Sequence, residues 1–271
     1  MKTGFLFCLA AFPLFATVNE PLRAELFSGY RNDRIHWHLQ DPGAEGALTY
    51  SELYRDVEYW ENGLLLKAIH RDLTFFLRGA YGAFGKGSVF PPHLHFSTKG
   101  WAADAVGYFG YAINLTAERT YKVILTPFIG YSAYFEQLKA RASAIPGTFR
   151  LVWNGVLLGG GFTIEPNGRW VFNVNYSYHF MHNRVHTSIE NEGIPQSIKT
   201  SSGGNKGHTG WAQMDWILNA VCRLGIGGQI HYFSSRVVDA TIRQANRGNF
   251  SEKFKLRWTA ISGWAQISRA F

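Results

Sequence analysis

Alternation of apolar and polar residues over segments of ten or more is the feature that most constrains the fold of this chain. Between Trp170 and Met181, apolar and mostly aromatic residues occupy every second position, and Asn, Ser and His occupy most positions between them. Successive side chains of a β-strand point to opposite faces, so this segment predicts a strand with one aromatic and one polar face. A lipid-facing strand fits this pattern better than a half-buried soluble one.

The same two-residue period recurs along the chain and predicts an all-β protein. The alternating segments number about ten, and they lie at roughly 25–39, 48–70, 73–86, 100–116, 120–136, 147–164, 168–182, 209–223, 226–238 and 253–271. They predict a transmembrane antiparallel up-and-down β-barrel, in which lipid-facing and interior residues alternate. Pro127 predicts a bulge or local irregularity, since proline donates no ladder hydrogen bond. A soluble secreted β-sandwich is the alternative fold, and it fits one-sided aromatic strands less well.

The connections between these segments alternate in length. Short ones lie around residues 70–72, 116–119, 165–168 and 224–225, and long ones at 86–100, 136–147, 183–208 and 239–252. Short turns at one end and long loops at the other are typical of bacterial outer-membrane barrels. The even number of strands predicts that both termini are periplasmic.

The composition agrees with a barrel and argues against membrane helices. Charged residues make up 17% of the chain and aromatic residues 16%, whereas soluble domains carry roughly 25% charged residues. After residue 20 no run reaches the roughly 18 apolar residues that a spanning helix requires. The mean hydropathy of −0.12 is near zero, as expected when lipid-facing and interior residues alternate.

The first residues have the features of an export signal. Met1 and Lys2 give a short basic start, and residues 4–16 form an apolar run that is followed by polar sequence. This pattern predicts a signal peptide over residues 1–16, with an end anywhere from 16 to 24, and a single barrel domain over 25–271. Cys8 lies in the leader, so Cys222 remains as a lone thiol that cannot form an internal disulfide.

The last residue and the net charge point to envelope partners. Phe271 ends the chain on an alternating segment, although Arg269 interrupts the pattern. A terminal aromatic resembles the signal that the barrel-insertion machinery reads. The net charge is +8, and the scattered cations fit a lipopolysaccharide-rich leaflet better than nucleic acid.

Several charged residues are expected on the interior face of the strands. They are Asp33, Arg34, Arg78, Lys122, Arg150 and Asp215. Buried charges must be paired, so a structural polar core is the first interpretation and an ion-selective constriction is the second.

Seven of the ten histidines fall into three groups. His93 and His95 lie in one predicted loop, and His179, His182 and His186 lie near the start of another. His36 and His38 share a strand face. Ordinary polar residues are the preferred interpretation over a metal site, which needs two to four converging ligands. We expect no metal and no cofactor.

Three stretches resemble the omptin family of ten-stranded outer-membrane proteases. They are Ser28–Ile35, which looks like the omptin first strand, Leu48–Leu73, which looks like the long second strand and its turn, and Gly79–Gly87, which looks like the third strand and its exit. The same stretches also resemble small omptin-like barrel proteins of chlamydia-type bacteria. The resemblance implies the barrel fold over nearly the whole mature chain.

The resemblance does not extend to the omptin catalytic residues. Omptins use a pair of aspartates in the second outer loop and an Asp–His pair in the fourth. Here residues 86–100 contain no Asp or Glu, and the region of His182 and His186 has no Asp at the family spacing. Asp33 matches the acidic residue that lines the omptin specificity pocket, but one matching residue does not make an active site. Because both catalytic pairs are missing, we predict no catalytic residues.

The first hypothesis for function is a non-enzymatic outer-membrane barrel that presents its outer loops to a host, a partner protein or the envelope. The first alternative is a small pore for ions or small solutes. The second is an omptin-type endopeptidase with rearranged acidic residues, in which Asp33 acts at the outer rim. A lipid-modifying barrel enzyme would need a nucleophile and a base in mutual reach, for which His70, Ser201 and Ser202 are available.

Overall fold

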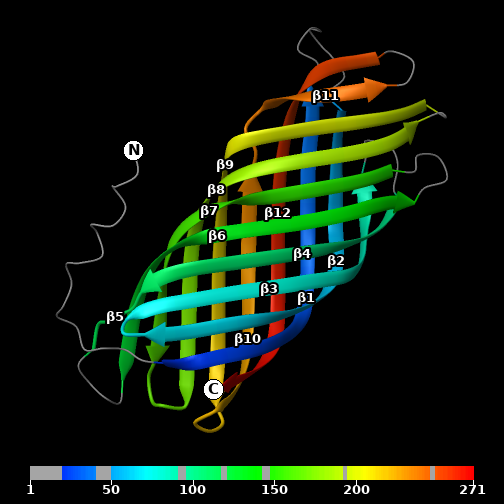
Figure 1. Ribbon diagram of the computed structural model, residues 1–271. Helices are drawn as coiled ribbons and strands as arrows, with labels where there is room; N and C mark the ends of the chain where they lie inside the picture. The colour runs from blue at the N-terminus through cyan, green and yellow to red at the C-terminus, as the bar shows by residue number, and fades with distance from the viewer. Residues whose placement is uncertain are drawn as a thin grey trace, which may run out of the picture.

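The chain forms one antiparallel sheet that closes on itself (Figure 1). The computed structural model describes residues 20–40, 50–90, 96–116, 121–141, 147–191, 194–244 and 248–271. The sheet closes because β12 (Gly248–Ala270) pairs with β1 (Glu20–Gln40), from Arg23 opposite Ala270 to Gln40 opposite Lys253. The predicted leader, residues 1–16, lies outside the described residues and stays a prediction.

The predicted ten-stranded barrel is confirmed. Between β1 and β12 the elements are β2 (Tyr50–His70), β3 (Leu73–Phe90), β4 (Phe96–Tyr111), β5 (Ile113–Asn114), β6 (Lys122–Arg141), β7 (Gly147–Glu165), β8 (Trp170–Asn191), β9 (Ile194–Ile217), β10 (Cys222–Ser234) and β11 (Val238–Gln244). The short β5 continues β4 along β6, and β11 continues β10 between β9 and β12. The twelve labelled elements of the described chain therefore make ten strands, because β5 counts with β4 and β11 counts with β10.

The predicted long loops are largely strand, which corrects their assignment. Residues 183–208 belong to β8 and β9, which pair as far as Asn191 opposite Ile194. Residues 86–100, 136–147 and 239–252 are also strand over most of their length. These segments are polar on their outer face, so their composition resembles that of loops. Val185 and Ile198 nevertheless point into an apolar core and hold the hairpin against the barrel.

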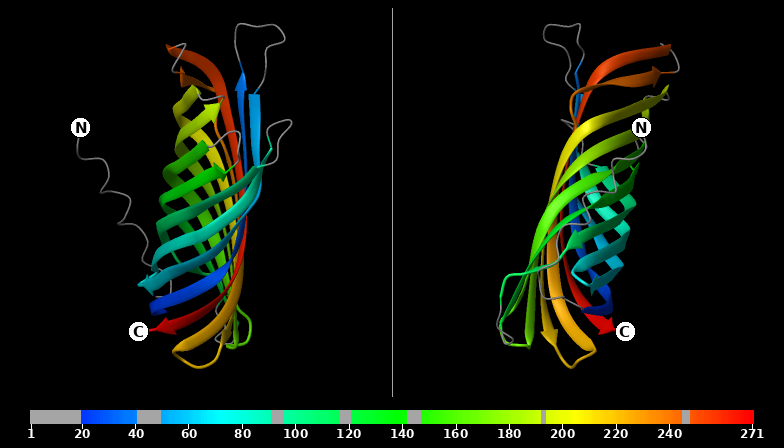
Figure 2. Two further views of the ribbon diagram at one scale, coloured as in Figure 1. Left: turned by 90° about the vertical axis from the view of Figure 1, so that its right-hand side faces the viewer. Right: turned by 60° about the vertical axis from the view of Figure 1, so that its left-hand side comes forward.

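The short turns gather at one end of the barrel, where Phe271 also lies (Figure 2). Arg71 and Asp72 both have positive φ, 47° and 69°, as in the type I′ turns of tight hairpins. The turn expected at 224–225 lies instead at 218–221, where the Asn219 side-chain oxygen accepts hydrogen bonds from the amides of Val221 and Cys222. Most of the turn predicted at 116–119 lies outside the described residues.

The irregularity expected at Pro127 is present without a bulge. The pairing of β6 with β4 ends at Phe128 and resumes with β5 at Leu125, in unchanged register. Opposite the gap, the amide of Ala112 donates to the carbonyl of Asp72 at 2.6 Å. The missing N–H of proline thus interrupts the ladder for two residues.

The outer face of the barrel is a broad apolar band with many aromatic side chains. Its exposed aromatic residues include Tyr30, Trp60, Tyr81, Trp101, Phe109, Tyr131, Phe135, Tyr176, Phe180, Trp216 and Tyr232. Exposed rings that flank a band of aliphatic side chains are the signature of a lipid-facing barrel surface. No helix among the described residues has the length and apolarity of a membrane span.

The interior changes character along the barrel axis. Towards the short turns, buried polar side chains such as Glu25, Gln213 and Asp215 lie among small apolar clusters. In the opposite half, which we call the outer half, the inward side chains form a large apolar cluster that includes Trp37, Trp153 and Trp258. The exposed face of the outer half is polar, so the usual inside–outside order of a soluble protein holds there.

Candidate functional site in the barrel interior

A network of buried charges crosses the middle of the barrel and unites two of the predicted residues. Arg31 holds Asp33 through two hydrogen bonds, Nε to Oδ1 at 2.7 Å and Nη2 to Oδ2 at 2.6 Å. Arg78 donates to Glu61 Oε1 at 2.5 Å and also to Asp104, which accepts a 3.4 Å bond from Arg31 as well. All five side chains are nearly inaccessible to solvent. The two guanidinium groups therefore bridge strands β1 to β4.

Aromatic side chains complete this network on its outer side. Trp258 Nε1 donates to Asp33 Oδ2 at 3.2 Å, and Tyr59 donates to Glu136 Oε1 at 2.7 Å. The Arg31 guanidinium lies 5.4 Å from the Trp258 ring centre and 5.8 Å from that of Tyr59. Buried charges with this many partners act first as a structural element that fills the interior.

Asp215 belongs to a second polar group near the short turns. The Gln213 amide donates to Glu25 Oε2 at 3.0 Å and to Asp215 at 2.9 Å, and the Gln266 amide bridges the same two carboxyl groups at 2.9 Å and 2.8 Å. Lys122 lies at the start of β6, in phase with inward Ile124, at the same end of the barrel. The structure therefore places Asp33 and Arg78 in one group and Asp215 in another.

Two predicted interior residues lie on the outer face instead. Arg34 is exposed because its neighbours Asp33 and Ile35 are the residues of β1 that point inward. Arg150 is exposed for the same reason, since Phe149 and Leu151 point inward. Strand phase, rather than charge, therefore decides which side of the barrel these two residues face.

The predicted loop histidines do not form a site in the described residues. His182 and His186 lie on the exposed face of β8, where His182 Nε2 contacts Ser201 Oγ at 3.0 Å. Partial burial, Lys199 and Arg150 lower the pKa of His186. His93 and His95 lie outside the described residues. The described part of the chain brings together no group of three or more potential metal ligands.

The residues available for lipid chemistry are also kept apart. Ser202 points inward and donates to Asn183 at 2.5 Å, whereas Ser201 is exposed on the opposite face of β9. His70 ends β2 at the short-turn end of the barrel. No described contact joins His70 to either serine.

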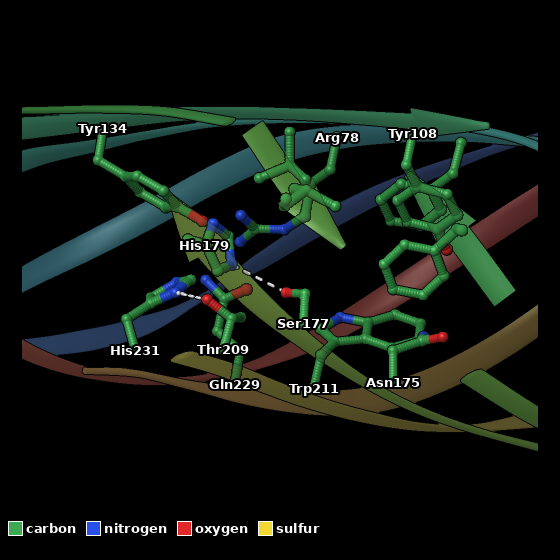
Figure 3. A pocket seen from close by; sticks show the side chains of 14 residues that line it. Arg78, Tyr108, Tyr134, Asn175, Ser177, His179, Thr209, Trp211, Gln229 and His231 are labelled. Carbon is green, nitrogen blue, oxygen red and sulfur yellow. Dashed lines mark hydrogen bonds between the residues drawn. The ribbon is translucent and has the colours of Figure 1, made fainter. Parts of the chain in front are cut away.

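A cavity of about 50 Å³ lies beside the charge network, with two buried histidines at one end (Figure 3). His179 contacts Ser132 Oγ through Nδ1 at 2.9 Å and Ser177 Oγ through Nε2 at 2.8 Å. His231 Nδ1 contacts Thr209 Oγ1 at 2.9 Å. A space of this size holds a few water molecules or one molecule of similar size.

Sequence reasoning missed most of this cavity. His231, Thr209 and Gln229 line it, yet none of them lies in a motif. Arg31 and Glu61 of the charge network were missed as well. Strand phase was the available signal, because Arg31 is in phase with Asp33, and His231 is in phase with inward Phe233. Phase assigns a side chain to the interior but does not tell which interior side chains meet.

Comparisons with known proteins define the fold. No protein-family model and no curated protein matches the sequence. The structure is similar to the outer membrane protease OmpT from Escherichia coli, with a TM-score of 0.75 at 8% identity over 95% of this chain and 99% of OmpT. Lower scores relate it to the translocator domain of the autotransporter NalP from Neisseria meningitidis (0.45 at 10% identity, over 93% of this chain and 89% of that domain) and to Ail, the attachment invasion locus protein of Yersinia pestis (0.30 at 10% identity, over 91% and 99%).

The similarity to OmpT shows that this chain has a β-barrel fold of the OmpT type. At 8% identity it carries no information about activity. The expected resemblance to omptins therefore holds at the level of the fold. The closer resemblance to barrels of chlamydia-type bacteria has no support among the structural matches and stays a prediction.

Proposed function

We propose that this protein is a non-conducting barrel of a bacterial outer membrane, whose outer half binds acidic partners through its exposed face. The main observation behind this proposal is that the apolar side chains change from the outer face to the inner face along the barrel axis. The lipid-facing band gives way to an outer half that is apolar inside and basic outside. Such a segment is stable in water on all sides and presents sheet surface rather than a channel mouth.

The apolar cluster of the outer half supports a closed barrel. Trp37, Trp153, Phe233 and Trp258 are at most 1% exposed, and they fill the space between opposite walls. The charge network lies directly beneath them, since Trp258 bonds to Asp33. An ion crossing this region would lose its hydration without gaining ligands. The pore alternative therefore gains no support from the described interior.

The endopeptidase alternative gains no support either. It places Asp33 at the outer rim with other carboxylates around it. In the structure Asp33 is fully buried and is held by Arg31 and Trp258. A peptide bond at the outer surface could not reach it without unpacking the apolar cluster.

Basic residues dominate the exposed face of the outer half. Those that are exposed are Arg34, Arg55, Lys86, Lys99, Lys139, Arg150, Arg184, Lys199, Lys206, Arg236, Arg243 and Arg257. Among the side chains described there, the exposed carboxylates are Asp56, Glu58 and Asp239, and Asp239 is bonded to Lys253 at 2.6 Å. A surface of one charge sign attracts polyanions over several ångströms.

The proposal includes an orientation of the barrel in the membrane. The cations nearest the aromatic band suit the phosphate groups of a lipopolysaccharide leaflet, and the short-turn end then faces the periplasm with both termini. Phe271 is 71% exposed at that end, where the barrel-insertion machinery could read it. A host or envelope molecule with acidic groups would meet the outer half.

One group of basic residues on the proposed partner surface lies where β1 meets β12. Arg257 lies opposite His36, and Lys255 lies opposite His38. The rings of His36 and His38 are 4.0 Å apart, and Arg34 follows on the same face of β1. We call these five residues the β1–β12 basic face.

Heparin, a sulfated polysaccharide, serves as the probe for this surface. The refolded protein should bind immobilised heparin in a salt-dependent way, and Lys255→Glu with Arg257→Glu should weaken binding at least about tenfold. The matched control is Lys139→Glu with Arg150→Glu, which makes the same charge change on β6 and β7. Equal weakening by both pairs would show a diffuse charge effect and contradict a site on the β1–β12 basic face.

A further inference from the structure

The cavity beside the charge network combines a polar end with an aromatic wall. Tyr134, His179 and His231 surround one end, and the ring of Tyr108 stands at the other (Figure 3). Tyr108 is stacked between Phe76 and Phe128, with ring centres 4.4 Å and 4.1 Å apart and interplanar angles of 7° and 18°. This stack forms a flat, largely apolar wall.

Several side chains that line the cavity carry a buried nitrogen atom without a hydrogen-bond partner among the described residues. These atoms are Trp211 Nε1, Gln229 Nε2, His231 Nε2 and Arg78 Nε. Gln229 is 7% exposed and His231 2%. Buried polar atoms in native proteins are nearly always satisfied. A molecule bound in the cavity, ordered water included, would satisfy these atoms.

The chemistry of these atoms determines what the molecule must offer. The indole, amide and guanidinium nitrogens can only donate hydrogen bonds, so the molecule needs acceptor atoms such as a carbonyl or hydroxyl oxygen. Arg78 is already engaged by Glu61 and Asp104 through its two Nη atoms. An additional charge would be desolvated without a counterion of its own, which favours a neutral molecule.

The cavity can be approached from the short-turn end of the barrel. A second, polar cavity shares Phe76, Tyr108, Asn175 and Trp211 with it. This second cavity extends to Thr74, Thr163 and Arg223, each within two residues of a short turn or of a strand end beside one. In the other direction the apolar cluster of the outer half closes the interior. The second cavity therefore lies on the short-turn side of the first, and four side chains separate or border the two.

We propose that this cavity is a binding site for a small, uncharged molecule with an acceptor oxygen, which enters from the short-turn end. The Gln229 amide and the Trp211 indole N–H donate to its oxygen, and its apolar part lies against the ring of Tyr108. The size of the cavity limits the molecule to a few non-hydrogen atoms. This site is independent of the basic outer surface and would exist even if that surface bound nothing.

Acetamide is the probe, because it has one carbonyl oxygen and few atoms. The test is an NMR titration of the ¹⁵N-labelled, refolded protein in detergent, in which the Trp211 indole signal is assigned with Trp211→Phe. We expect a saturable shift of this signal with a midpoint on the order of millimolar, which is typical for so small a ligand. The lipid-facing Trp216 indole provides the internal control and should not shift in a saturable way.

Two variants separate binding from general solvent effects. Gln229→Met removes the amide at nearly constant volume, and it should raise the midpoint about tenfold while the protein stays folded. Gln244→Met, in β11 and away from the cavity residues, should leave the midpoint unchanged. A linear shift shared by all indole signals would overturn the proposal. So would an unchanged midpoint in Gln229→Met, or a crystal structure grown with acetamide that shows only water in the cavity.

Discussion

At the scale of single residues, the interior depends on charges that satisfy one another. Arg78 donates to Glu61 and Asp104 and lies 4.7 Å from the centre of the Phe27 ring. Arg31 ties Asp33 to Asp104. Removing one member of such a group leaves the others buried without a counterion. This destabilises the protein more than replacing the whole group by apolar side chains would.

Substitution of Arg78 by methionine should therefore be severe. Arg78→Met keeps the side-chain volume but leaves the carboxyl groups of Glu61 and Asp104 without this partner. We expect the free energy of unfolding to fall by about 3–5 kcal/mol. Guanidinium unfolding of the refolded protein, followed by tryptophan fluorescence, measures the loss. Arg169→Met, at an exposed turn position, is the control and should change stability by less than about 0.5 kcal/mol. A similarly small effect of Arg78→Met would show that the network contributes little.

At the scale of elements, alternation in the sequence predicted the number of strands but not their length. The aromatic face of β8 made its membrane part evident, because Phe172, Val174 and Tyr176 all point to lipid. Beyond Met181 the inward positions mix polar and apolar residues, such as Asn183 and Val185. The outward positions are polar as well, so the period disappears although the strand continues. Backbone pairing and the shared core, which sequence periodicity does not show, extend the hairpin.

Neighbouring residues of β8 provide a direct check on this hairpin. Val185 is 2% exposed within the apolar cluster, whereas Arg184 is exposed. Val185→Asp buries an unpaired carboxylate and should abolish or strongly destabilise the folded barrel. Arg184→Asp should be tolerated. Heat-modifiable gel mobility after refolding reports folding for both variants. Equal tolerance of both would support the loop that composition alone predicted.

The β1–β12 basic face should respond to pH. Partial burial lowers the pKa of His36 and of His38 below the usual 6.5, and nearby cations reinforce the shift. The cations acting on His36 are Arg34 on its own strand, Arg55 on β2 and Arg257 on β12, with His38 beside it. Both histidines are therefore neutral at pH 7 and become charged only on acidification below about 6.5.

Two consequences follow from this shift, with opposite signs. The added charge should strengthen heparin binding as the pH falls from 7 to 5. The unfolded chain takes up these protons at higher pH than the folded chain, so the free energy of unfolding should fall over the same interval. Affinity measured at both pH values, for the native protein and for His36→Asn with His38→Asn, tests the first effect. A pH-dependent gain that survives in the double variant would have to come from other groups.

At the scale of the whole molecule, the barrel consists of two sections with different interiors. The section within the lipid-facing band has polar groups inside, including the cavity that ends at His231. The outer half has a core of the kind found in soluble proteins. The sequence predicted the barrel through its lipid-facing strands, but it could not show that the interior is closed. Closure depends on side chains from opposite walls, such as Trp153 and Trp258, which are far apart in the chain.

Single-channel recording in a planar bilayer tests the central claim, a barrel closed by its own apolar core, most directly. The refolded protein is first shown to be folded by heat-modifiable mobility and is then inserted at neutral pH and moderate salt. We expect insertion without discrete, reproducible conductance steps, because Trp37, Trp153, Phe233 and Trp258 fill the described interior of the outer half. Discrete steps of constant size from the folded native protein would contradict the closed barrel and favour the pore.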